Sequence, residues 1–384
     1  MTSVSPVPAP NRNPLLRKDE MSAIAVDSLY KVFGKGARSA VAQLKSGTPR
    51  DQLTAKSVTA AVIDHNWSIE PGEIFVVMGL SGSGKSTLIR MLNGLIKPTS
   101  GTIRIGGVEL GSLSNRELRR LRREKISMVF QHFALLPHRT VVENVAFGLE
   151  IKGMGKPERL ERAREAVLLA GLAGHEDKLP AQLSGGMKQR VGLARALAAD
   201  TEILLMDEAF SALDPLIRQE MQDQLLDLQS KLGKTIVFIT HDLNEAMRIG
   251  DRIAICDGEV KQLGTAEDIL MHPADEYVAD FTADVDRTRV LTAEAVMEPC
   301  GTRDTSAFTT VESDVPVNEL YEPVLNSKAP LLVVDDNADP LGVVTPRSII
   351  KSLSHDAVAD PASDAAAGAA PEPGTATEEE RQPA

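Results

Sequence analysis

Residues 79–87 read Gly79-Leu80-Ser81-Gly82-Ser83-Gly84-Lys85-Ser86-Thr87 and follow directly on the apolar residues 74–78. A short apolar run bounded by turn residues predicts a strand that is buried on both faces. Residues 88–92 then continue as a predicted helix. A strand, a glycine-rich loop and a helix in this order form the P-loop pattern, so we expect the loop to bind phosphate groups.

The loop has the chemistry that a nucleotide site needs. Glycine lets the backbone wrap phosphates without clashes of Cβ atoms, and N–H groups at the helix N-terminus supply positive potential. Lys85 is expected to reach the β- and γ-phosphates of ATP, and Ser86 to bind Mg²⁺. The predicted ATP site also includes Gly79, Ser81, Gly82, Ser83, Gly84 and Thr87. The alternative, a glycine-rich turn that binds nothing, is disfavoured by the strand and helix on either side.

Two acids end a second apolar run, residues 203–208. A single acid at the end of such a strand beside a P-loop suits Mg²⁺, and we assign that role to Asp207. Glu208 is then placed to polarise the attacking water as general base. The competing interpretation is a solvated strand end. His241 follows another predicted strand, residues 235–240, and is expected within reach of a γ-phosphate.

Helices and strands alternate through this region. Apolar residues recur at helical spacing from Ile217 to Leu232, and Gly233 follows as the expected end of that helix. The buried strand at residues 235–240 comes next. This alternation predicts an α/β fold with a parallel sheet and helices on its faces.

The composition narrows the class of protein. A net charge of -12 over 384 residues argues against a nucleic-acid binder. Cys256 and Cys300 are too few for a disulfide framework and fit a reducing cytosol. No run approaches the roughly 18 apolar residues of a membrane span. Work at a membrane would therefore require docking on another subunit.

Three further motifs accompany the P-loop and the two acids. Leu183-Ser184-Gly185-Gly186 opens an alanine-rich helix, Gln131 follows residues 129–130, and Ser211-Ala212-Leu213-Asp214 follows the two acids. With the P-loop they resemble the signature, Q-loop and D-loop of the nucleotide-binding subunit of ATP-binding-cassette (ABC) transporters, over about residues 22–285. The resemblance implies a RecA-like parallel core, an antiparallel β subdomain and a helical signature subdomain at about residues 132–195.

The family's mechanism is implied for the matching residues. Two subunits would pair head to tail as a homodimer with two ATP molecules between them, and Ser184 and Gly186 of one subunit would touch the γ-phosphate held by Lys85 of the other. Gln131 would contact Mg²⁺ and sense the nucleotide, and it would form the catalytic set with Glu208 and His241. Residues 133–139 would carry motion to the membrane subunit. The ATP-binding set implied by the family also includes Gly185 and Asp214.

The adenine ring is expected to stack on an aromatic side chain of the first strand region. Phe33 stands where the family usually has an aromatic residue, and Tyr30 is a nearby competitor. The alternative for either ring is packing in the core.

A closer resemblance is to the ATPase of glycine betaine/proline importers. The resemblance is carried by the insertion at residues 34–66, the stretch 72–87, Met187 after the signature, and residues 206–218. It implies an osmoprotectant importer with a membrane permease, a solute-binding protein outside the cell, and a peripheral position on the cytoplasmic face of the membrane. Solute choice lies in the permease and the binding protein, so it follows from family likeness alone.

Three other classes fit parts of the pattern. An importer of amino acids, polyamines or sugars would share the cassette. A soluble ABC ATPase for DNA repair or translation would carry a long coiled coil or a second cassette, and the sequence shows neither. A regulatory cassette without hydrolysis is disfavoured by the presence of Lys85, Asp207, Glu208 and His241.

Residues 286–355 resemble a cystathionine-β-synthase (CBS) module, a regulatory domain of betaine importers. The predicted strands are 308–312, 331–335 and 341–344, and the predicted helices are 315–325 and a helix from 345. The family usually carries two such modules, and Ser348 stands where adenosine-binding variants have Asp. We expect modules from two subunits to pair and report ionic strength, and the alternative is a dimerisation or spacer domain.

The two terminal segments, 1–21 and 356–384, are predicted to be disordered. Residues 355–384 carry seven acids and one base, a charge of -6, and would act as a charged element. Translation from Met1 or from Met21 stays open. The basic run 116–125 could face lipid or a permease, but its interleaved leucines and acids favour a solvated helix face.

Overall fold

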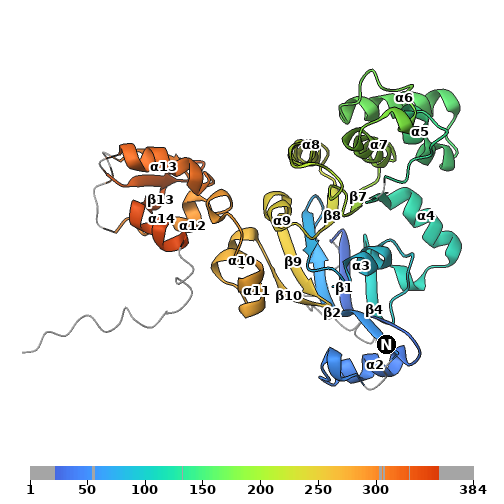
Figure 1. Ribbon diagram of the computed structural model, residues 1–384, viewed down its shortest axis with the longest axis horizontal. Helices are drawn as coiled ribbons and strands as arrows, with labels where there is room; N and C mark the ends of the chain where they lie inside the picture. The colour runs from blue at the N-terminus through green and yellow to red at the C-terminus, as the bar shows by residue number, and fades with distance from the viewer. Residues whose placement is uncertain are drawn as a thin grey trace, which may run out of the picture. The chain divides into compact units, whose positions relative to one another are not determined.

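The computed structural model describes residues 22–53, 57–131, 133–301, 305, 308–327 and 329–353 (Figure 1). The chain divides into two compact units, Met1–Val290 and Leu291–Ala384. The segments expected to be disordered, 1–21 and 356–384, lie outside the described residues.

A sheet of six strands forms the centre of the first unit, in the order β10-β9-β3-β8-β7-β6. The strands are β3 (Ile74–Met78), β6 (Ile126–Val129), β7 (Ile203–Asp207), β8 (Thr235–Thr240), β9 (Arg252–Asp257) and β10 (Glu259–Gly264). All neighbouring pairs are parallel except β9 and β10, which pair antiparallel. Every residue of β3 is buried, as expected for the centre of a parallel sheet. The predicted parallel core is confirmed.

Helices cover this sheet and explain the apolar spacing in the sequence. Three of them are α3 (Lys85–Leu92), α8 (Pro215–Leu232) and α9 (Leu243–Ile249); α3 and α9 contact strands of the sheet, and α8 contacts α9. Leu88 and Leu92 of α3 are buried in one core with Phe75 and Val77 of β3. Helix α8 ends at Gly233, whose φ of 59° is left-handed, as the sequence predicts.

A second sheet is antiparallel and has the order β2-β1-β4-β5. Its strands are β1 (Ile24–Phe33), β2 (Thr59–Ile69), β4 (Ser100–Ile105) and β5 (Val108–Glu109). Trp67 of β2 packs on Phe75 of β3 with ring centroids 5.0 Å apart, so the two sheets share a core. The insertion between β1 and β2 contains α2 (Ala37–Lys45) and a 3-10 turn (Arg50–Gln52), and α2 buries Ala40 and Val41 against Tyr30.

Three helices, α5 (Val141–Ile151), α6 (Lys156–Leu169) and α7 (Gly185–Ala198), pack on one another between β6 and β7 in the sequence (green in Figure 1). The basic run forms α4 (Asn115–Lys125), which buries Leu118 and exposes most of its arginines, as a solvated helix face would. The remaining elements of the unit are 3-10 turns at Leu110–Ser112, Pro180–Gln182 and Arg287–Arg289, and helices α10 (Ala266–Met271) and α11 (Glu276–Phe281).

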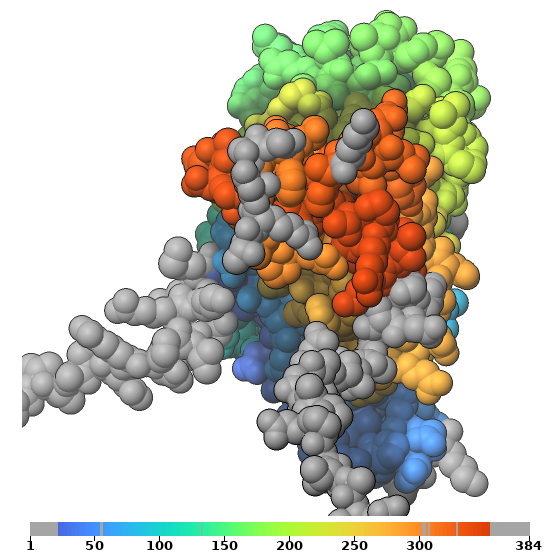
Figure 2. Space-filling view, turned by 90° about the vertical axis from the view of Figure 1, so that its left-hand side faces the viewer, coloured from blue at the N-terminus to red at the C-terminus, as the bar shows by residue number. Residues whose placement is uncertain are grey.

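The second unit, orange to red in Figure 2, is a small α/β fold. Its elements are α12 (Ala293–Val296), β11 (Thr310–Glu312), α13 (Val317–Asn326), β12 (Leu331–Val334), β13 (Pro340–Val344) and α14 (Pro346–Leu353). Strands β11 and β12 are parallel, and β12 and β13 are antiparallel. Ser348 is buried, and its Oγ accepts a hydrogen bond from the Thr345 N–H at 3.0 Å.

Candidate active site

The P-loop, residues 79–84, connects β3 to α3 through left-handed glycines. Gly79 has φ 151°, Gly82 has φ 87° and Gly84 has φ 94°. A Cβ at Gly79 would lie 2.1 Å from the carbonyl oxygen of Cys256, and one at Gly84 would lie 1.8 Å from that of Ala61. Glycine is therefore required at both positions by conformation and by space. A Cβ at Gly82 would meet nothing within 4 Å, so the middle of the loop is open to a ligand.

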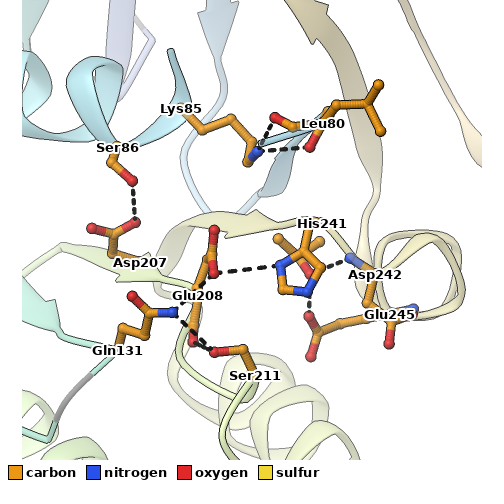
Figure 3. A network of polar contacts seen from close by, with 12 residues as sticks. Leu80, Lys85, Ser86, Gln131, Asp207, Glu208, Ser211, His241, Asp242 and Glu245 are labelled. Carbon is orange, nitrogen blue, oxygen red and sulfur yellow. Dashed lines mark hydrogen bonds and ion pairs between the residues drawn. The ribbon is translucent and has the colours of Figure 1, made fainter. Parts of the chain in front are cut away.

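Lys85 turns its ammonium group back into this loop (Figure 3). Its Nζ donates hydrogen bonds to the carbonyl oxygens of Gly79 at 2.6 Å and Leu80 at 2.9 Å. Burial lowers the pKa of Lys85, and the negative charge of Glu208 partly offsets that effect. The buried cation is held by neutral carbonyl groups, and a phosphate would give it a charged acceptor.

Asp207, the last residue of β7, faces the first turn of α3. The Ser86 hydroxyl donates to Asp207 Oδ1 at 3.4 Å. Burial raises the pKa of Asp207, and the adjacent charge of Glu208 raises it further. A cation beside Ser86 and Asp207 would relieve the cost of this buried charge, so the pair fits a Mg²⁺ site.

Within the described residues, no cluster of three or more His, Cys, Asp or Glu side chains could hold a metal ion by itself. Magnesium is commonly held through one or two protein carboxylates together with substrate phosphates, so a site of two protein oxygens agrees with this result.

Glu208 lies at the meeting point of three loops that follow β6, β7 and β8 (Figure 3). Its Oε2 accepts a hydrogen bond of 3.0 Å from Gln131 Nε2 and lies 3.4 Å from His241 Nδ1. Its own φ is 45°, a left-handed conformation that is uncommon outside glycine. Such strain costs about 1–3 kcal/mol and often occurs at active sites. The structure thus brings together the three residues that the sequence assigns to catalysis.

The sequence did not predict a set of hydrogen bonds that supports the loop bearing His241. The Arg218 guanidinium donates to Asp242 Oδ2 at 2.7 Å and to the carbonyl oxygen of Leu213 at 3.2 Å. Asp242 also caps α9 by accepting from the Glu245 N–H at 3.2 Å. These bonds connect residues 211–214 with the loop that bears His241. The sequence shows the basic residue, but it does not show which loop the side chain reaches.

The signature residues lie at the start of α7. Ser184 caps that helix and accepts from the Met187 N–H at 3.3 Å. A Cβ at Gly186 would lie 2.6 Å from Cγ2 of Ile217 on α8, so a larger residue there would require the Ile217 side chain or one of the helices to shift. Asp214 caps α8 in the same way, through the Ile217 N–H at 3.2 Å. Among the described residues of one chain, no hydrogen bond joins Ser184, Gly185, Gly186 or Asp214 to Lys85.

The two candidate adenine-stacking rings differ in exposure. Tyr30 is buried in the small core beneath α2, whereas Phe33 is 41% exposed at the end of β1. The Lys31 ammonium lies 4.8 Å from the centroid of the Phe33 ring. Only Phe33 therefore offers a ring face to a ligand without rearrangement.

In the part of the chain that is described, no helix is long and apolar enough to cross a bilayer.

The chain is similar in sequence to known proteins. Residues 62–211 match the family model described as ABC transporter. The glycine betaine/carnitine transport ATP-binding protein GbuA of Listeria monocytogenes is 60% identical over 279 residues, which cover 72% of this chain and 70% of that protein. The trimethylamine N-oxide transport system ATP-binding protein TmoW of Pelagibacter ubique is 46% identical over 331 residues, covering 86% and 97%.

Solved structures agree with the fold. The dimeric post-hydrolysis structure of the ATP-binding cassette MJ0796 bound to ADP and Pi is 35% identical and covers 63% of this chain and 98% of that one, with a TM-score of 0.54. The cbiO1 protein of Clostridium perfringens, part of the ABC transporter complex cbiONQ, is 26% identical and covers 69% and 96%, with a TM-score of 0.55.

Proposed function

Since the chain belongs to the family of ABC transporter ATP-binding subunits and hydrolyses ATP, we propose that it powers the import of glycine betaine or a related osmoprotectant. Three relatives at 54–60% identity are named for the transport of glycine betaine with carnitine, of glycine betaine, or of glycine betaine with proline betaine. The methionine import ATP-binding protein MetN of Bacillus subtilis is less similar, at 48% identity over 226 residues. Glycine betaine, carnitine, proline betaine and trimethylamine N-oxide all contain a fully substituted, four-coordinate nitrogen with a formal positive charge, which suggests the solute class.

The observation that carries the proposed mechanism is the contact of Gln131 and His241 with one carboxylate oxygen of Glu208. Glu208 accepts a proton from the water that attacks the γ-phosphorus, and the bond from that phosphorus to the oxygen of ADP breaks. Gln131 and His241 orient the Glu208 carboxylate. Lys85 and the N–H groups of the P-loop bind the phosphates.

Ser86 and Asp207, with Gln131, would hold Mg²⁺, which neutralises charge on the phosphates when it is bound. Phe33 would stack on the adenine. The remaining P-loop residues of the proposed ATP site are Gly79, Ser81, Gly82, Ser83, Gly84 and Thr87.

A second copy of the chain completes the proposed site in a head-to-tail homodimer. Ser184, Gly185, Gly186 and Asp214 stand at helix starts and would reach the ATP held by the partner. A similar cassette of known structure is a dimer bound to ADP and Pi, which supports pairing of two copies. The dimer would dock on a membrane permease at the cytoplasmic face, with a solute-binding protein on the other side of the membrane.

The division into a cassette of residues 22–285, a CBS-like module of residues 286–355 and terminal segments 1–21 and 356–384 also belongs to the proposal. The β11-β12-β13 sheet with α13 and α14 has the order of elements expected for one such module. We infer that two modules pair and report ionic strength, with the acidic residues 356–384 as the charged element. Unchanged salt dependence of transport after deletion of 356–384 would show that the tail has no part in sensing.

Uptake into vesicles tests the proposed solute class. The full chain is assembled with the permease and binding protein of a glycine betaine importer or, separately, with those of a methionine importer. ATP is enclosed on the side of this subunit, and uptake of the matching labelled solute is measured. ATP-dependent uptake with the glycine betaine permease alone is the expected result. Uptake with the methionine permease alone would move the chain to the amino-acid importers.

A further inference from the structure

The backbone between Gln131 and α5 is held by side chains of the helical region. Arg195 of α7 donates from Nη1 to the carbonyl oxygen of Ala134 at 2.6 Å and from Nη2 to that of Phe133 at 3.0 Å. Phe133 and Ala134 have φ of 52° and 47°, and they are consecutive left-handed residues that are not glycine. Such a conformation persists only where surrounding contacts enforce it.

Arg195 can enforce this left-handed backbone conformation. The two nitrogen atoms of its guanidinium fork reach two successive carbonyl groups, a geometry that the single ammonium of lysine cannot reproduce. Burial lowers the pKa of Arg195, and both of its hydrogen bonds among the described residues go to carbonyl oxygens. The half-buried guanidinium remains charged, so its binding to these carbonyls is strong and directional.

The following part of the loop has a second anchor on α5. Asn144 is fully buried, and its Oδ1 accepts from the Leu136 N–H at 2.7 Å. Its Nδ2 donates to the carbonyl oxygens of Leu136, Arg139 and Thr140, at 3.1, 2.9 and 3.0 Å. Residues 133–140 are thus fixed to α5 and α7, while Gln131, two positions before them in the sequence, contacts Glu208, which follows β7.

We propose that Arg195 is a positioning residue that couples the orientation of α7 to the contact between Gln131 and Glu208. Helix α7 carries Ser184 at one end and Arg195 near the other, about 16 Å away at 1.5 Å per residue. Engagement of the α7 N-terminus by a phosphate of the partner's ATP shifts this helix. Arg195 then passes the shift through two carbonyl groups to the loop that bears Gln131. This inference rests on the proposed roles of Glu208 and of the signature turn.

Arg190 provides a matched control on the same helix. Its guanidinium donates to Gln224 Oε1 at 3.0 Å and contacts Glu220 Oε2 at 3.2 Å on α8, away from the loop. Arg195→Lys and Arg190→Lys each remove one guanidinium fork from α7 and keep the charge. Loss of general packing would affect both variants alike, whereas loss of the loop anchor affects only the first.

Two measurements on the full-length chain test the inference. Amide hydrogen exchange in peptides that cover residues 133–140 is expected to speed up about tenfold or more in Arg195→Lys and to stay at the wild-type rate in Arg190→Lys. The kcat for ATP hydrolysis is expected to fall at least about tenfold in Arg195→Lys with an unchanged Kd for ATP, because a small misplacement of a catalytic contact is costly.

The outcomes separate the inference from the proposed function. Equal exchange of residues 133–140 in wild type and Arg195→Lys overturns the anchor, whether or not the chain is active. Faster exchange with unchanged kcat overturns the coupling to Glu208. A wild-type chain without ATPase activity contradicts the proposed mechanism, and the exchange experiment still decides the anchor.

Discussion

Gln131 Nε2 donates a hydrogen bond of 3.0 Å to the same Glu208 oxygen that lies 3.4 Å from His241 Nδ1. One carboxylate atom therefore receives contacts from loops that follow two different strands. Because both neighbours act on a single atom, their effects on catalysis should depend on each other.

Gln131→Ala and His241→Ala are each expected to lower kcat by about 10- to 100-fold, the usual loss when a partner that orients a catalytic group is removed. The double variant should lose much less than the product of the two factors, because either change alone already frees the carboxylate. Steady-state ATPase assays on the four proteins measure this coupling. Strict multiplication of the two losses would show that the residues act on separate groups.

The variants Gly84→Ala and Gly82→Ala distinguish the effect of a steric clash on stability from the effect of backbone strain. Both glycines have positive φ, 94° and 87°, but only the new Cβ at Gly84 meets backbone, 1.8 Å from the carbonyl oxygen of Ala61. Gly82→Ala should lower the free energy of unfolding by about 1–2 kcal/mol, the cost of a left-handed non-glycine residue. Gly84→Ala should cost clearly more, because β2 must move. Urea unfolding compares the two, and equal losses would contradict the close approach of the loop to β2.

Asp207→Asn should change stability and binding in opposite directions. Burial and the Glu208 charge raise the pKa of Asp207 in the folded chain, so its charged form opposes folding at pH values above that raised pKa. This destabilisation disappears as the pH falls below the pKa that Asp207 has in the unfolded chain, because the carboxyl group is then protonated in both states. At pH 7 with EDTA, the variant should therefore unfold at a higher temperature than wild type.

The same Asp207→Asn variant should gain less thermal stability than wild type when ATP and Mg²⁺ are added, because a ligand stabilises in proportion to its affinity for the folded state. Thermal unfolding at pH 7 and at a pH near 5, with and without Mg²⁺ and ATP, measures both effects. A variant that is less stable than wild type without ligand would show that the charge of Asp207 supports folding.

The central elements could be predicted because their signals are local. The apolar run of β3 lies directly beside the P-loop glycines, and the two acids end the apolar run of β7, so pattern and position coincide. The spacing of apolar residues likewise predicted α8 and its end at Gly233. In these segments a few neighbouring residues determine both the structure and the chemistry.

The contacts that fix the loops could not be predicted in the same way. Arg195 reaches Phe133 from 62 residues away, and Arg218 reaches Asp242 from 24 residues away. A basic residue on a helix looks alike in the sequence whether it faces solvent or a carbonyl group. The left-handed conformation of Phe133, Ala134 and Glu208 has no signal either, because tertiary contacts rather than glycine impose it.

Glu208→Gln tests the central claim most directly, with ATPase activity and dimer formation measured together on the full-length chain. The variant keeps the shape of the side chain and loses the proton acceptor, so kcat should fall by about 100- to 10,000-fold. Light scattering in ATP and Mg²⁺ should then show a lasting dimer, because ATP stays bound between the subunits. A variant that hydrolyses ATP as fast as wild type would contradict the assignment of Glu208 as the general base.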